Sequence, residues 1–216
     1  MNNETMTIHK GLAELKVLDA RIEKEINATT FSVANKHSNT VVNGVPIAEF
    51  ANQAKDALKS IKTLIARRND IKRKITRSNA STTVTIGGKE YTVAEAIDMK
   101  NVGMEHMKFL CSLIENQYTN AKMKAERENG EKLEQRADTY IQSLYQNADK
   151  KNLSEEVKKM RDDFMTSQTV EILDPIGSLK EVAALRNEID AFMAEVDSAL
   201  SVSNALTTIE IEYETY

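Results

Sequence analysis

The residues of this chain whose types could do chemistry are three histidines and one cysteine. A transition-metal site needs His, Cys or acidic side chains at short, characteristic spacings. His9, His37 and His106 lie far apart and lack such partners, which favours solvent-facing or hydrogen-bonded imidazoles. Cys111 falls on the apolar step of a helical pattern among Met and Ile residues, which is typical of a packed thiol. We therefore predict no metal site, no cofactor and no reactive cysteine.

Paired acids and one glycine pair are the remaining candidates for catalysis or phosphate binding. The acid pairs at 155–156 and 162–163 lie in a helical pattern, where solvated charge is their ordinary role. Gly87-Gly88 is not followed by the Lys-Ser/Thr of a phosphate-binding loop, and no nucleophile elbow or dinucleotide fingerprint occurs. The sequence therefore predicts no catalytic residues and no enzyme.

The strongest concentration of charge is a basic stripe at residues 59–77, in which Asp70 is the only acid. Several contacts from such a stripe to phosphate would give salt-sensitive binding to nucleic acid. No aromatic residue interleaves with it to stack on bases, and acids follow in the last helix and the tail. These acids favour charge pairing within the chain or between subunits. The residues we assign to contact with phosphate or an acidic partner are Lys72, Arg73, Lys74 and Arg77.

Composition points to helices packed through narrow seams. The chain has 216 residues, a net charge of −4, 41% hydrophobic residues, only 5% aromatic residues and no Trp. A single cysteine excludes an intramolecular disulfide and fits a reducing compartment. No apolar run reaches the roughly 18 residues of a membrane helix, so we expect a soluble protein without a membrane partner.

Apolar periodicity predicts the main elements. Five segments are expected to be helical: 8–27, 47–77, 93–146, 154–165 and 179–202. Asn43-Gly44 indicates a small hairpin, and Gly87-Gly88 a second one at 82–92. The heptad steps of 47–77 and 93–146 predict an antiparallel coiled-coil pair with that second hairpin as its tip. Arg68 interrupts the seam, where a lone polar residue can fix register, so we assign it to an oligomer surface.

One phrase occurs twice in the chain. Residues 78–86 read SNASTTVTI and residues 203–211 read SNALTTIEI, and the apolar positions of the preceding helices also superpose. This repeat predicts a unit of helix, Asn/Thr turn and strand that is used twice. The closing strand, 207–214, alternates apolar and acidic residues, and its apolar side should be covered by another strand. We expect strand 82–86 or a neighbouring chain to cover it, with a docking surface at Ile209, Ile211 and Tyr213.

A resemblance rests on the segment around the first copy of the phrase. Residues 67–71 through 78–80, then Thr83-Val84 and 88–97, resemble small helical proteins of unassigned role from bacterial and phage genomes, some labelled septicolysin-like. The chain is also similar to uncharacterised proteins of phage structural gene clusters. This resemblance implies a helical fold and carries no catalytic residues.

These observations lead to one prediction for the fold and three for the function. We expect a single elongated all-α domain, 1–216, built as an antiparallel coiled coil or helical bundle with small β-hairpin tips. A phage-type virion structural or assembly component would act by oligomerising and by docking to other structural proteins. A cytosolic helical adaptor of the bacterial cell is the alternative. A nucleic-acid-binding protein that uses the basic stripe is a third class.

Overall fold

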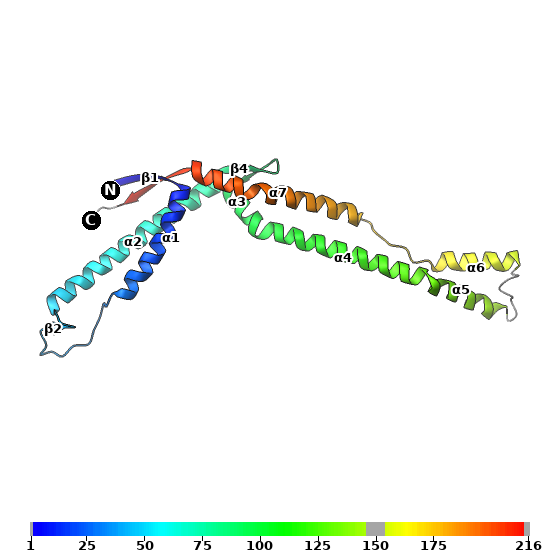
Figure 1. The fold of residues 1–216 in the computed structure, drawn as a ribbon, viewed down its shortest axis with the longest axis horizontal. Coiled ribbons are helices and arrows are strands. Elements are labelled where there is room, and N and C mark those ends of the chain that lie inside the picture. Colours follow the sequence, from blue (N-terminus) through cyan, green and yellow to red (C-terminus); the bar gives the residue numbers. More distant parts are fainter. Residues whose placement is uncertain (1, 146–153, 214–216) are drawn as a thin grey trace. The chain divides into compact units, whose positions relative to one another are not determined.

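The computed structural model describes residues 2–145 and 154–213 (Figure 1). The chain is mostly helical, as predicted, and the strands in these residues form three two-stranded antiparallel sheets. Contacts divide the chain into two compact units. Unit 1 contains residues 1–101 and 191–216, and unit 2 contains residues 102–190.

Unit 1 is built from helices and strands at both ends of the chain. Its elements are β1 (Asn2–Thr7), α1 (Ile8–Ala28), β2 (Val41–Val42), β3 (Val45–Pro46), α2 (Ile47–Ser81), β4 (Thr83–Ile86), β5 (Lys89–Thr92), α3 (Val93–Asp98), the last part of α7 (Ser178–Leu206) and β6 (Thr208–Tyr213). A short π-helix, η1 (Met99–Gly103), follows α3. Residues 146 and 214, which end two of the expected elements, lie outside the described residues.

Local sequence signals explain the turns of unit 1. Asn43 and Gly44 have φ values of 47° and 82°, as a two-residue hairpin turn requires. Gly87 and Gly88 have φ values of 57° and 74°, which suit glycine because it lacks a Cβ. The hydroxyl of Thr92 accepts a hydrogen bond from the backbone N–H of Glu95, whose carboxylate accepts one from the N–H of Thr92. This capping box starts α3 where the sequence predicts it.

The helix that pairs with α2 in the buried cluster is α1, and of the segment 93–146 that we predicted as its partner, α3 contacts α2. One buried cluster joins β1, α1, α2 and β6 through Met6, Ile8, Leu15, Leu18, Ile71, Ile75, Ile209 and Ile211. Leu64, on the predicted heptad seam of 47–77, also packs on this cluster. The heptad pattern of 47–77 marks a buried stripe, but many apolar partners could have covered that stripe.

The segment 93–146 is not one helix either. It is divided into α3, η1, α4 (Met104–Asn129) and α5 (Glu131–Leu144). Gly130, with φ −76° and ψ −140°, ends α4 and begins α5. The Asn/Thr phrases, expected as turns, begin as helix, since the N–H groups of Thr82 and Thr207 still bond the carbonyls of Ser78 and Ser203. For this reason α2 and α7 extend to Ser81 and Leu206.

The repeated phrase reflects two equivalent halves of unit 1. The first half contains β1, α1, α2 and β4, and the second contains β5, α3, the last part of α7 and β6. Thr83 pairs with Thr92 in one sheet, and Thr208 pairs with Thr7 in the other. Thr92 and Thr7 each cap the helix that follows. Both sheets therefore combine one strand from each half in the same register.

This pairing corrects the expected partner of the last strand. β6 is completed by another strand, as its alternation predicts, but that strand is β1 and not residues 82–86. The sequence of β1, NNETMT, is mostly polar and shows no clear alternation, so it gives little signal for a strand.

Unit 2 contains α4, α5, α6 (Glu155–Gln168) and the first part of α7. The rings of Tyr140 and Phe164 stack with centroids 4.5 Å apart and join α5 to α6. Residues 169–173 are irregular and have no strand partner among the described residues. The side-chain amide of Asn129 takes that place, since it accepts from the N–H of Val170 at 2.7 Å and donates to its carbonyl at 2.8 Å.

Candidate interaction surfaces

Arg67, in the basic stripe, is committed to contacts inside unit 1. Its guanidinium donates to the carboxylates of Glu14 at 2.5 Å and Glu4 at 2.9 Å. The hydrogen bond to Glu14 and then that to Glu4 raise the pKa of Arg67 above its ordinary value. The same contact with Arg67, followed by that with Lys10, lowers the pKa of Glu4. This cluster ties α2 to α1 and β1 and leaves Arg67 little capacity for an external anion.

Arg68, which we assigned to an oligomer surface, also bonds within the chain. Its guanidinium donates to the carboxylate of Asp19 on α1 at 2.9 Å, and its side chain is 35% exposed. A polar residue at this seam position therefore finds its partner on α1. Charge pairing within the chain is present as the sequence indicates, but α1 and β1 supply the acids for both arginines instead of the last helix and the tail.

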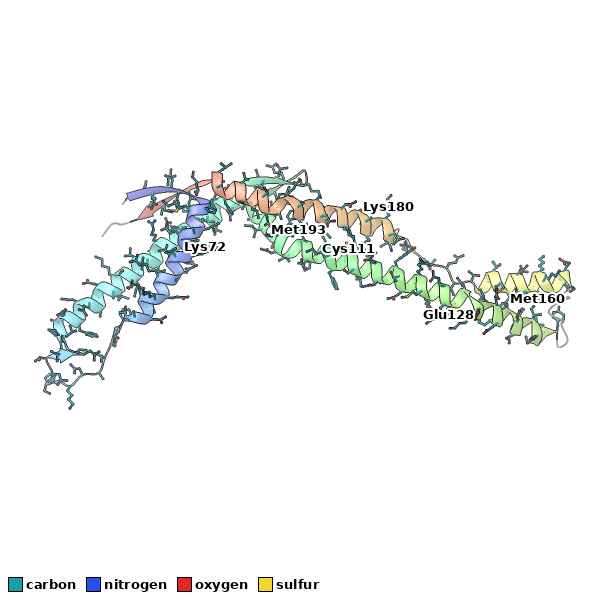
Figure 2. All side chains as sticks on the ribbon, in the orientation of Figure 1. Lys72, Cys111, Glu128, Met160, Lys180 and Met193 are labelled. Atoms are coloured by element: carbon teal, nitrogen blue, oxygen red, sulfur yellow. The ribbon has the colours of Figure 1, made fainter. Side chains whose placement is uncertain are left out.

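The four residues assigned to phosphate or an acidic partner do not form one site. Arg73 forms an ion pair with Asp70, three residues earlier on α2. Lys72, labelled in Figure 2, and Arg77 are exposed, and Lys74 is half-buried. These three have no ion-pair partner among residues 2–145 and 154–213.

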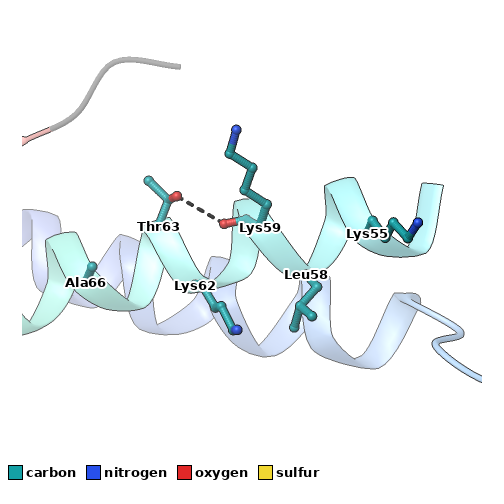
Figure 3. Close-up of a pocket in the computed structure, with 6 residues that line it drawn as sticks. All are labelled: Lys55, Leu58, Lys59, Lys62, Thr63 and Ala66. Atoms are coloured by element: carbon teal, nitrogen blue, oxygen red, sulfur yellow. Dashed lines mark hydrogen bonds between the residues drawn. The ribbon is translucent and has the colours of Figure 1, made fainter. Parts of the chain in front are cut away.

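An open hollow of about 470 Å³ lies farther along the stripe. Its lining comes from α2 alone: Lys55, Leu58, Lys59, Lys62, Thr63 and Ala66. The ammonium groups of its three lysines point in different directions (Figure 3). A bound phosphate needs donors that converge on one point, so this hollow is not a built anion site.

The docking residues predicted on β6 are unavailable in this structure. Ile209 is 5% exposed and Ile211 is 1% exposed, because both pack in the core of unit 1. Their apolar side is covered by elements of the same chain in this conformation, and their assignment to a contact between subunits stays a prediction. The backbone of Tyr213 pairs with Asn2, while its side chain is outside the described part of the chain.

An apolar surface that the sequence analysis missed lies on α4. Phe109 is 71% exposed, Leu110 44% and Leu113 43%, whereas Met104 and Cys111 on the same helix are buried. We call Phe109, Leu110 and Leu113 the α4 patch. Its signal in the sequence is a group of large apolar residues beside the heptad seam, not on it. Three large side chains within one turn and a half are unusual on a fully solvated helix.

The other residues considered for chemistry are dispersed. His9, His37 and His106 are exposed, and Cys111 is 4% exposed. Within the described ranges, no group of three or more His, Cys, Asp or Glu residues could hold a metal ion. The helices in those ranges are too short or too polar to cross a membrane. Comparison of the chain with protein-family models, curated proteins and solved structures finds no match.

Proposed function

We propose that this protein is a structural or assembly component of the phage-virion type, which works by forming homo-oligomers and docking to other structural proteins. The observation that carries the proposal is the α4 patch, because Phe109 alone leaves most of its ring in water. Burying apolar side chains of this size against a partner is strongly favourable, about 25 cal/mol per Å². The proposal includes coiled-coil packing of the helices in the assembled state.

The exposed area of the chain supports the same proposal. The chain exposes 15174 Å². A compact monomer of 24.2 kDa exposes about 10,000 Å², and two separate compact bodies sharing that mass expose about 12,000 Å². One chain contributes about 1,000–2,500 Å² to an obligate subunit interface, so two such interfaces would cover the excess of about 3,000 Å². An assembled state would cover surface that this single chain leaves in water.

Two other functions receive less support. A cytosolic adaptor of the bacterial cell would use the same apolar surface, but for a different partner, and the resemblance to phage structural proteins favours the virion. A nucleic-acid-binding role would use the cations of the basic stripe, and three of them, Arg67, Arg68 and Arg73, are already paired within the chain.

Light scattering of the purified chain and of a double variant, Phe109→Ser with Leu113→Ser, tests the proposal. We expect the wild-type chain to have an oligomeric mass and the variant to shift toward the monomer, because serine removes the apolar contact. Val17→Ser is the matched control, since Val17 on α1 is 66% exposed and lies outside the patch. Equal masses for all three proteins would contradict the role of the patch. Protein mass spectrometry of purified virus particles would separate the virion component, present at fixed stoichiometry, from the adaptor, which is absent.

A further inference from the structure

β6 is connected to one half of unit 1 but packs on the other. It continues from α7 after a single residue, Thr207. Its partners are β1 and α2, both in the first half, and its buried isoleucines, Ile209 and Ile211, lie in the cluster formed with β1, α1 and α2. By connectivity β6 belongs to the second half, and by packing it belongs to the first.

β4 has the reciprocal arrangement. It continues from α2 in the first half, and it pairs with β5 and contacts α3 in the second. The residue just after it, Gly87, donates its backbone N–H to Glu195 on α7 at 2.7 Å. At the equivalent point of β6, Glu212 donates its N–H to Asp70 on α2 at 3.2 Å. The last strand of each half therefore pairs with a strand of the other half, as in the two subunits of a strand-exchanged dimer.

The two sheets differ in how their strands are joined. β4 and β5 are linked by the two-residue turn Gly87-Gly88. β1 and β6 belong to opposite ends of the described chain and are held together only by non-covalent contacts. A two-stranded sheet is marginal on its own, and release of β6 would put Ile209 and Ile211 into water. A released β6 therefore needs a replacement site, and the best one is the same site on another copy.

We propose that β6 is exchanged between copies of this chain, so that β6 of one copy pairs with β1 and packs on α2 of the next. This inference rests on the proposed function and names the partner, a second copy, and the element that connects them. Exchange preserves each contact of β6, so its equilibrium depends on protein concentration and not on a new interface. Repeated from copy to copy, it would join chains in series.

Disulfide trapping between two single-cysteine variants tests the exchange. The pair is Thr5→Cys and Glu210→Cys, each made with Cys111→Ala, because Thr5 and Glu210 are exposed register partners in the β1–β6 sheet. The control pair is Thr85→Cys and Glu90→Cys, the equivalent partners in the β4–β5 hairpin. Each pair is mixed, unfolded and refolded together at high concentration, then oxidised and analysed by non-reducing gel and peptide mapping.

We expect the 5/210 mixture to yield a covalent heterodimer with a disulfide between residues 5 and 210, at least several-fold above the 85/90 mixture. Equal yields from the two mixtures would overturn the exchange. A single chain carrying both Thr5→Cys and Glu210→Cys checks the register, and failure to crosslink there would also overturn it. If light scattering shows oligomers without a 5/210 crosslink, the exchange is wrong and the proposed function stands. A chain that remains monomeric refutes both.

Discussion

Asp70 on α2 and Glu195 on α7 hold equivalent positions in the two halves of unit 1. The carboxylate of each accepts a hydrogen bond from a backbone N–H at or just after the last strand of the other half. Asp70 accepts from Glu212 at 3.2 Å, and Glu195 accepts from Gly87 at 2.7 Å. Asp70 is the only acid in the basic stripe, and its carboxylate binds the backbone near the end of β6. The two acids are therefore structural counterparts, although their surroundings in the sequence differ.

Asp70→Ala should loosen β6 without unfolding unit 1. A hydrogen bond to a charged group contributes about 1.5–3 kcal/mol, so amide exchange at Glu212 should accelerate about tenfold or more. Glu195→Ala should have the same effect at Gly87, while Asp70→Asn, which keeps an oxygen acceptor, should have a smaller one than Asp70→Ala. Asp56→Ala on α2 is the control. Hydrogen exchange measured by mass spectrometry or NMR decides this, and equal acceleration by the control would contradict the role of Asp70.

Glu4 should make unit 1 sensitive to acid. Arg67 and Lys10 hold the pKa of Glu4 below its ordinary value of 4.5, so the folded chain binds its proton less readily than the unfolded chain does. Its contribution to the free energy of unfolding is present above that ordinary value and is lost as the pH falls through the lowered pKa. Glu4→Gln should lower stability at neutral pH and weaken the loss in acid. Urea unfolding at pH 7 and at about pH 3.5 measures both effects, and an unchanged pH dependence would contradict the assignment.

Gly11 should tolerate a methyl group but not a larger side chain. A Cβ built there lies 3.2 Å from the Cδ1 of Ile75, a terminal methyl group that can move, and 3.4 Å from the Cγ2 of Ile71, the methyl group on its β-carbon. Gly11→Ala gains helix propensity that offsets this crowding, so its stability should stay within about 1 kcal/mol of the wild type. Gly11→Leu should destabilise unit 1 by about 1–3 kcal/mol through overpacking. Thermal and urea unfolding measure the stability of both variants. A Gly11→Leu protein as stable as Gly11→Ala would contradict the prediction.

Asn129 should control the segment that connects α6 to α7. Its amide makes two hydrogen bonds to the backbone of Val170, and no carboxylate can make both, because one of them requires a donor. With each lost bond costing about 1 kcal/mol, we expect Asn129→Asp, which loses the donor, to increase amide exchange at Val170 about fivefold, and Asn129→Ala, which loses both bonds, to increase it about thirtyfold. Thr119→Ala on the exposed side of α4 is the control. Unchanged protection of Val170 in Asn129→Asp would show that the amide donor is unnecessary.

The sequence predicts those elements whose signals are local. Asn43-Gly44 and Gly87-Gly88 identify hairpin turns because few residues accept positive φ, and Thr92 with Glu95 identifies the start of α3 because the capping box lies within four residues. The repeated phrase shows that a structural unit is used twice. These features depend on near neighbours in the chain, which a sequence displays directly.

The sequence does not predict which elements pack together. The stripe containing Leu64 and Ile71 must be buried, but its apolar pattern fits α1 and the segment 93–146 equally well. The pairing of β6 with β1 brings Glu210 against Thr5, about as far apart in the chain as two residues can be. The α4 patch was missed because Phe109 and Leu113 lie beside a convincing seam, and the seam alone accounts for the helix. Such choices depend on the summed packing of many residues.

The central claim, that this chain works in an assembled state, is tested most directly by sedimentation equilibrium of the full wild-type protein over a series of concentrations. The account predicts a mass that is a multiple of the 24.2 kDa chain at micromolar concentration and that decreases toward 24.2 kDa on dilution. A mass of 24.2 kDa throughout the series would contradict it, because the α4 patch would then face water at every concentration.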